Sequence, residues 1–383
     1  MLYASVAKAA FIYSFFHIIN LCNNRNITRP INSDSPPRRL PCAEKAWHNS
    51  KVAPAFRLLA TLGLINMSAT KLTEIQLKKL RPLEAKLKAA VGSASPEKAV
   101  EIAGQIQSLF PNDRSHHRLL RAKLWAFEAC LDANRLTYAQ NGFIGVRKLS
   151  GNTTRLYLEA SSLLAVCYLR NKKTSEAKKL TKEVIEKINN ISSDRTRHQF
   201  QKRFIERIEE ECILTELIGA GEAQLNTKEI EAKAILLIQK SSDSEIFKLI
   251  GNSIPTASIN LLSDMRAYSI NQLPPPDRKR LPPPEKAEQP QKIGKTTFAL
   301  LKRIAWKTFC DPESTIYKLW SKRIPKVFNE GYFSAAIVTS LSDFKIGIPL
   351  LASGVTALVM KYSAEEFCEL SKPKGLMIDR NEK

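Results

Sequence analysis

The chain is poor in glycine, in histidine and in cysteine pairs at metal-binding spacing. Only 14 of its 383 residues are glycine, whereas lysine, glutamate, leucine and alanine are abundant, which favours helix over sheet. The seven cysteines are dispersed without a Cys-x-x-Cys pair, so their spacing supports neither a zinc cluster nor a disulfide framework. We therefore expect an all-α protein without a metal centre, working in the reducing cytoplasm.

Signatures of catalysis are scarce as well. The chain has five histidines and lacks both the His-Glu-x-x-His and the Gly-x-Ser-x-Gly motifs. His116 and His117 stand beside Arg118 at a predicted helix start, where a solvated basic surface is the simpler interpretation. The Gly-Lys-Thr sequence at 294–296 is similar to the end of a phosphate-binding loop, but Gln289 occupies the place of that loop's first glycine. We expect no enzyme, no cofactor and no small-molecule substrate.

Positive charge, in contrast, is plentiful. Lysine and arginine number 59 against 37 aspartates and glutamates, which gives a formal net charge of +22. Such an excess favours anionic partners, either nucleic acid or an acidic membrane surface. A helical surface that is simply solvated would give the same composition, so charge alone does not choose between these alternatives.

The most regular stretch of the chain runs from 155 to 188 and predicts two antiparallel helices joined by a tight polar turn at 171–174. Small and apolar residues recur at helical spacing in both halves: Leu158, Ser162, Ala165 and Leu169, then Ala177, Leu180, Val184 and Ile188. A hairpin of this kind is typical of interaction scaffolds rather than of catalytic sites.

This hairpin resembles a tetratricopeptide repeat. The repeat pattern asks for a leucine and a small residue, then an aromatic residue, then an alanine. Leu164, Ala165, Tyr168 and Ala177 stand at those positions. The resemblance implies an irregular stack of helical hairpins, a tetratricopeptide-like domain, that binds a protein partner.

Several signature residues of the repeat are replaced. Ser161 stands for the opening tryptophan, Thr181 for the later phenylalanine and Asn189 for the closing proline. A second, partial match covers 96–113, where Ala99 and Pro111 are in step with the pattern. An ordinary helical bundle is the alternative interpretation.

Caps and apolar spacing predict further helices on both sides of the hairpin. We expect them at 68–91, 96–111, 115–130, 131–149, 193–218, 230–239, 245–250 and 255–268. Within 68–91, apolar residues keep helical spacing after Pro82, which can sit in the first turn of a helix, and Phe200 and Phe204 are placed on the buried side of 193–218.

Two stretches divide the chain into domains. Residues 272–292 hold seven prolines and many charges, which predicts an extended polyproline linker, or alternatively a ligand for an SH3-like groove. Residues 1–66 contain a short apolar run at 9–22 that suits a signal-peptide core better than a transmembrane helix. We interpret 1–66 as a leader or disordered segment outside the fold, with translation starting near Met67; an anchor or signal is the alternative. The expected domains are a helical repeat-like domain at 67–271 and a basic, apolar helical module at 293–383.

The C-terminal module combines a basic aromatic segment, 295–328, with an apolar segment, 332–360. Basic amphipathic helices with tryptophan are typical of membrane surfaces, and the same side chains suit nucleic-acid binding. We expect an anionic surface to be bound by Lys295, Lys302, Arg303, Trp306, Lys307, Lys318, Trp320, Lys322, Arg323 and Lys326. Residues 346–360 rise about 22 Å as a helix, less than the ~30 Å hydrocarbon core. They form either a buried core helix or a membrane-associated segment.

The leading hypothesis from the sequence is a non-enzymatic scaffold. Its repeat-like domain would bind a protein partner, and its C-terminal module would associate with or act on a membrane through 332–360. The alternative is a nucleic-acid-binding helical protein that uses 295–328. Plain core packing of the aromatic residues is the third interpretation.

The hairpin geometry predicts how two substitutions affect stability. If Tyr168 and Ala177 face the seam between the two helices, both are buried, and Ala177→Leu overpacks the seam at a cost of ~1–3 kcal/mol. Lys172, in the turn, is expected in water, so Lys172→Ala costs almost nothing. Thermal denaturation of both variants tests the placement. An unchanged melting temperature for Ala177→Leu, together with a lowered one for Lys172→Ala, would contradict it.

Overall fold

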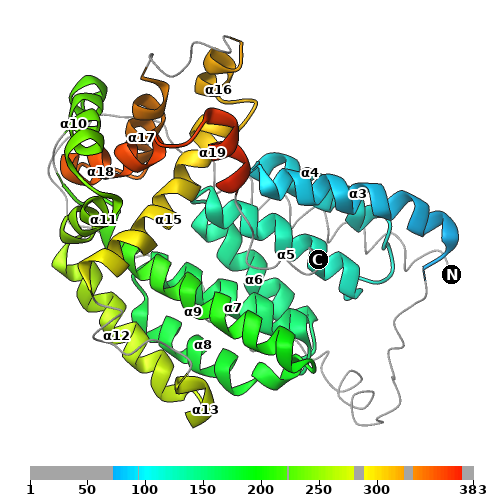
Figure 1. The fold of residues 1–383 in the computed structure, drawn as a ribbon. Coiled ribbons are helices and arrows are strands. Elements are labelled where there is room, and N and C mark those ends of the chain that lie inside the picture. The colour runs from blue at the N-terminus through cyan, green and yellow to red at the C-terminus, as the bar shows by residue number, and fades with distance from the viewer. Residues whose placement is uncertain (1–71, 94, 222–223, 280–288, 323–330, 373–383) are drawn as a thin grey trace, which may run out of the picture. The chain divides into compact units, whose positions relative to one another are not determined.

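The computed structural model describes residues 72–93, 95–221, 224–279, 289–322 and 331–372. These residues form helices joined by turns and contain no strand, so the expected all-α class is confirmed (Figure 1). The stretch from Met67 to Lys383 makes one compact unit. The leader predicted at 1–66 lies outside the described residues.

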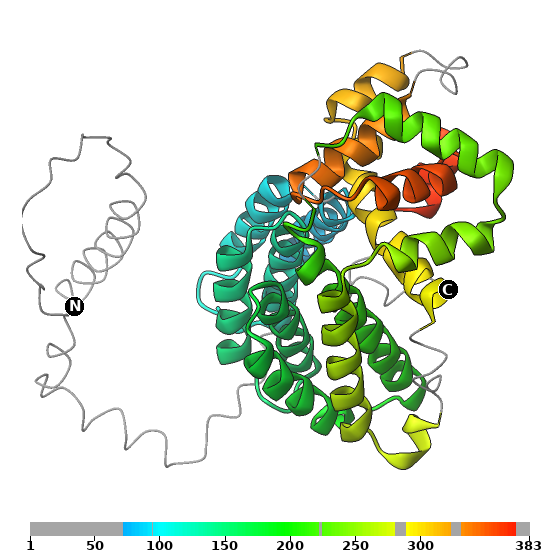
Figure 2. The same cartoon turned by 90° about the vertical axis from the view of Figure 1, so that its left-hand side faces the viewer.

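The first six described helices follow one another as packed hairpins. The pairs are α3 (Glu74–Gly92) with α4 (Pro96–Ser108), α5 (His117–Asp132) with α6 (Leu136–Leu149), and α7 (Arg155–Arg170) with α8 (Thr174–Glu186). α5 packs against α3, and α7 packs against α5, so the first helices of the hairpins are neighbours (Figure 2). Packed adjacent helix pairs of this kind are compatible with a helical repeat.

The second and third hairpins turn in the same way. Asn134 after α5 and Lys172 after α7 adopt left-handed backbone conformations, with φ of 60° and 57°. In each turn the following amide donates a hydrogen bond of 2.8 Å to a helix carbonyl five positions back, as in a Schellman cap. The two turn residues are 38 positions apart (172 − 134), and so are the fully buried Ala139 and Ala177 (177 − 139). The two hairpins therefore share their turn geometry and one buried alanine at a spacing of 38 residues, which is compatible with a helical repeat.

The hairpin predicted at 155–188 is confirmed in its helices and its turn. Ala177 is fully buried, and Lys172 is exposed, with its ammonium 3.3 Å from the Glu216 carboxylate. Tyr168 is only partly buried against the core, so the expectation of nearly complete burial was wrong. Its neighbours Cys167, Leu169 and Arg170 are buried, so the end of α7 turns those side chains to the core and Tyr168 to a less covered side.

The start of α3 also differs from the expectation. The Thr73 side chain accepts a hydrogen bond from the Gln76 amide (3.2 Å), and the Gln76 side chain accepts one from the Thr73 amide (3.0 Å). This reciprocal cap fixes the helix start at Glu74, so Pro82 lies inside α3 and not in its first turn. Proline has no amide hydrogen, so α3 continues through Pro82 with one intrahelical hydrogen bond fewer.

The remaining helices follow α8 and a short 3₁₀ turn, Ile188–Asn190. They are α9 (Asp194–Leu217), α10 (Thr227–Lys240), α11 (Asp243–Asn252), α12 (Thr256–Gln272), α13 (Pro275–Arg278), α15 (Pro290–Cys310), α16 (Thr315–Trp320), α17 (Tyr332–Asp343), α18 (Pro349–Val359) and α19 (Ala364–Leu370). α9 packs against α7 and α12, and it buries Phe200 and Phe204 as expected.

Both ends of the predicted linker 272–292 are helical. Pro275–Arg278 forms the helical turn α13 instead of extended polyproline, and 280–288 lie outside the described residues. α15 begins at Pro290 and packs along α11. Helices from before and after the prolines thus belong to the single unit Met67–Lys383.

Glycines set the contact between α15 and α11. A Cβ atom on Gly294 of α15 would overlap with the Phe247 carbonyl oxygen of α11, and one on Gly251 of α11 would overlap with the Pro290 carbonyl. Only a residue without a side chain lets the two backbones approach this closely. The Gly-Lys-Thr sequence at 294–296 is thus accounted for by helix packing.

The apolar segment 332–360 is packed inside the unit. α18 contacts α10 and α11, α17 contacts α15, and every α18 residue from Leu351 to Val359 is buried. Among the described residues, no helix has the length and apolarity needed to cross a membrane. Of the two interpretations of 346–360, the buried core helix agrees with this packing.

One disulfide corrects the expectation drawn from cysteine spacing. Cys310, at the end of α15, is bonded to Cys368 of α19, 58 positions away in the sequence. No spacing motif marks such a pair, because folding alone brings the two helices together. Cys130, Cys167 and Cys212 are free and buried.

The close approach of α15 and α11 predicts the effect of one added methyl group. Gly294→Ala places a Cβ against the Phe247 carbonyl, so the helices must separate, and we expect a loss of ~1–3 kcal/mol. Gly145→Ala in α6 is the matched control, because no atom lies within 4 Å of its Cβ position. Replacing this helical glycine should raise stability by up to ~1 kcal/mol. Chemical denaturation of both variants gives the comparison, and equal effects would show that the contact is looser than described.

Candidate functional site

Three consecutive glutamates in α9 each bind an arginine from a different helix. Arg266 of α12 donates to Glu209 (Nη1 to Oε1, 2.6 Å), and Arg303 of α15 donates to Glu210 (Nη1 to Oε2, 2.8 Å). Arg170 of α7 binds Glu211 with two hydrogen bonds, of which Nη2 to Oε2 measures 2.8 Å. We call Glu209–Glu211 the α9 glutamate run.

The geometry of a helix explains this arrangement. Successive residues are turned by about 100° around the axis, so three adjacent side chains point to different neighbours. Because α9 has helices on several sides, these glutamates cannot all reach water. Glu211 is completely buried, and the Arg170 side chain paired with it is 2% exposed. A buried carboxylate needs such a partner.

A fourth arginine continues the network on α9 itself. Arg207 donates to Asp132 at the end of α5 (Nη2 to Oδ1, 2.7 Å) and lies 3.9 Å from Glu211. Burial alone would raise the pKa of Asp132, but Arg207 and the other nearby arginines hold that pKa below its usual value. For Glu209 burial prevails over the attraction of Arg266, and its pKa is raised. The network is a structural one, because each of its charges is matched by a neighbour.

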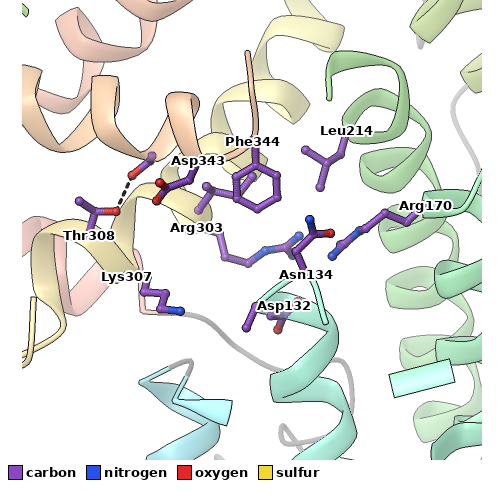
Figure 3. Close-up of a pocket in the computed structure, with 12 residues that line it drawn as sticks. Asp132, Asn134, Arg170, Leu214, Arg303, Lys307, Thr308, Asp343 and Phe344 are labelled. Carbon is purple, nitrogen blue, oxygen red and sulfur yellow. Dashed lines mark hydrogen bonds between the residues drawn. The ribbon is translucent and has the colours of Figure 1, made fainter. Parts of the chain in front are cut away.

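A pocket of about 270 Å³ opens beside this network (Figure 3). We call it the α15 pocket. It lies where the ends of α5 and α7 meet α9, α15 and α17. It is lined by Asp132, Ala133, Asn134, Arg170, Leu214, Arg303, Ile304, Lys307, Thr308, Ser340, Asp343 and Phe344.

Most polar groups of the α15 pocket are already engaged. Arg170 and Arg303 are paired with glutamates of α9, and Ser340 donates a hydrogen bond to the Thr308 hydroxyl (2.8 Å). Lys307 and Asp343 differ, because both are exposed and neither makes an ion pair or hydrogen bond with any described residue. These two side chains are the charges that the pocket can offer to another molecule.

The structure brings only two of the ten predicted anion-binding residues together in this pocket. Arg303 and Lys307 are four positions apart on α15 and both line it. Of the remaining lysines, Lys295 and Lys302 lie over phenylalanine rings of α11 and α15, at 5.7 and 5.6 Å from the ring centres. Lys318 and Lys322 are exposed at α16, and Arg323 and Lys326 lie outside the described residues.

The two predicted tryptophans belong to the core. Trp306 donates from Nε1 to the Cys368 carbonyl (2.7 Å), and Trp320 donates to the Phe309 carbonyl (2.8 Å). Their exposed fractions are 5% and 4%. An indole must present a free face to stack on a base, and in this conformation neither ring does so.

Sequence reasoning missed the network around Glu211. Glutamates next to lysines on an exposed helix face are ordinarily solvated, and apolar spacing alone does not distinguish Glu211 from such residues. The sequence did offer one signal of a buried carboxylate: a run of three glutamates inside a helix that has apolar residues on all sides. In such a helix at least one of three consecutive side chains points toward the core. Among the described residues, no group of three His, Cys, Asp or Glu side chains is placed to hold a metal ion.

Comparisons with known proteins add no relative. No family model matches the chain, and no curated protein or solved structure is significantly similar to it. Inferences about function therefore rest on the residues and their geometry.

The two basic side chains that α15 contributes to the pocket should differ in their effect on stability. Arg303→Ala removes the hydrogen-bonded partner of the half-buried Glu210 and leaves it only Arg207, 3.9 Å away, so we expect a loss of ~1–3 kcal/mol. Lys307→Ala removes an exposed, unpaired charge and should change stability by less than ~0.5 kcal/mol. Urea denaturation of both variants tests this. A Lys307 variant as damaged as the Arg303 variant would mean that Lys307 has a structural partner.

Proposed function

We propose that the chain is a non-enzymatic protein-interaction scaffold of the tetratricopeptide-repeat type, which binds a protein partner at the α15 pocket. The observation that carries this proposal is the pair of unengaged charges, Lys307 and Asp343, on the lining of one pocket. Because the other charged side chains that line this pocket are paired internally, an exposed pair of this kind is available for recognition.

The lining suggests which chemistry the partner presents. Lys307 suits a carboxylate, and Asp343 suits an ammonium or guanidinium group. Leu214, Ile304 and Phe344 add apolar surface to the same lining. A peptide segment that carries an acidic and a basic side chain next to an apolar one matches this lining, and such complementarity supports specific pairing more than raw affinity.

Two alternative functions receive less support. The apolar residues of 332–360 that a membrane would need are occupied by packing within the unit, with α18 buried almost along its length. The tryptophans that a nucleic acid would need are in the core. Membrane association and nucleic-acid binding, like the cytoplasmic location, stay predictions.

Selection of short peptides tests the proposal. A displayed library of random twelve-residue peptides is selected on the purified full-length chain, and enriched peptides are resynthesised and titrated. We expect enriched peptides with both acidic and basic residues, whose affinity falls at least tenfold for Lys307→Glu. Lys345→Glu is the matched control, because this lysine is also exposed but does not line the pocket.

Two outcomes would contradict the proposal. In the first, every enriched peptide binds the Lys307→Glu and parent proteins equally. In the second, no peptide is enriched, while the parent protein binds anionic liposomes or a DNA duplex in a salt-dependent manner. The second outcome would return one of the two alternatives to first place.

A further inference from the structure

A second depression lies on a different part of the unit, between α4, α5 and α6. It has a volume of about 280 Å³ and is formed by Val100, Ala103, Gly104, Gln107, Lys123, Ala126, Phe127 and Tyr138. We call it the Lys123 groove. It shares no residue with the α15 pocket.

The floor and one wall of the Lys123 groove are apolar. Ala103 and Ala126 are buried, and a Cβ atom on Gly104 would meet no atom within 4 Å, so α4 leaves open space there. Phe127 and Tyr138 form the wall with their rings 5.7 Å apart in an edge-to-face contact. Tyr138 is 50% exposed, so about half of its surface is open to solvent.

Lys123 gives the groove a charge that the fold leaves without a counter-charge. Its side chain is half-buried, and it makes no ion pair or hydrogen bond with any described residue. Burial, with a smaller effect of the nearby Arg114, lowers the pKa of the Lys123 ammonium. Partial burial removes some of the water that would otherwise stabilise the charged ammonium. A carboxylate placed next to the ammonium would stabilise its charge instead.

We propose that the Lys123 groove docks a short acidic segment of a protein partner, with an apolar side chain over Gly104 and Phe127 and a carboxylate paired with Lys123. The occupant follows from charge complementarity, since a half-buried unpaired ammonium beside an apolar wall excludes a basic or purely apolar segment. This inference rests on the proposed scaffold function and names a second contact, separate from the α15 pocket.

The lining of the Lys123 groove favours an acidic peptide over a phosphate-bearing partner. A nucleic acid could pair a phosphate with Lys123, but it would leave the apolar floor between Ala103 and Ala126 unfilled. A peptide can pair with Lys123 and also cover the apolar floor, because its acidic and apolar side chains project from adjacent positions. Gly104 is therefore the position where a peptide-specific contact can be blocked without changing any charge.

Two groove variants test the proposal on peptides from the twelve-residue library selected on the full-length chain. We expect one enriched family to carry an apolar residue next to aspartate or glutamate. A member of that family should lose at least tenfold in affinity for both Lys123→Glu and Gly104→Leu. Lys123→Arg, which keeps the charge, should retain most of the affinity, and circular dichroism establishes that each variant is folded. If Lys123→Glu does not fold, Lys123→Gln and Gly104→Leu give the same comparison.

The outcomes separate this inference from the proposed function. Peptides that respond to Lys307→Glu but not to Lys123→Glu or Gly104→Leu would overturn the groove and leave the α15 pocket standing. If the affinity of the peptides falls only for the groove variants, the Lys123 groove is supported as a docking site and the α15 pocket is contradicted as one. An absence of acidic peptides, with binding of a labelled DNA duplex that Lys123→Glu abolishes and Gly104→Leu leaves intact, would assign the groove to phosphate and contradict the proposal.

Discussion

The structure depends on the pairing of buried charges along α9. Each residue of the α9 glutamate run meets an arginine from another helix, and Arg170 and Glu211 are almost completely removed from water. Two charges in such a place stabilise each other, since removing Glu211 leaves Arg170 buried without its carboxylate, and removing Arg170 leaves Glu211 with only the more distant Arg207, 3.9 Å away. The pairs therefore select one arrangement of α7, α12 and α15 around α9, where apolar packing alone would accept several. We regard this specificity as their main contribution.

The same constraint explains why the residues after the prolines belong to the core. Arg303 connects α15 to α9, and Gly294 lets α15 lie directly against α11. With α15 held there, α17 and α18 cover apolar surface that a free module would expose. The α15 pocket lies at this junction, and Lys307 and Asp343 are exposed on its lining.

Local signals in the sequence predicted local structure well. Apolar spacing and caps placed α7, α8 and α9, and the small residue at Ala177 marked a close helix contact. Contacts between residues far apart in the sequence could not be predicted, because apolar periodicity identifies the buried face of a helix but not which other helix packs against that face. Trp306 was therefore assigned to a binding surface although it packs in the core, and Cys310 was left without its partner Cys368. Of the site, only Arg303 and Lys307 were predicted, since the pocket exists only once five helices meet.

A double-mutant cycle on Arg170 and Glu211 tests the central claim most directly. The two single variants, Arg170→Met and Glu211→Met, and the double variant are compared with the parent by urea denaturation. If α9 is held by a buried pair, each single substitution costs ~3–5 kcal/mol, and the double variant is far more stable than the sum predicts. Additivity of the two effects within ~0.5 kcal/mol would contradict the account, because independent side chains behave in that way.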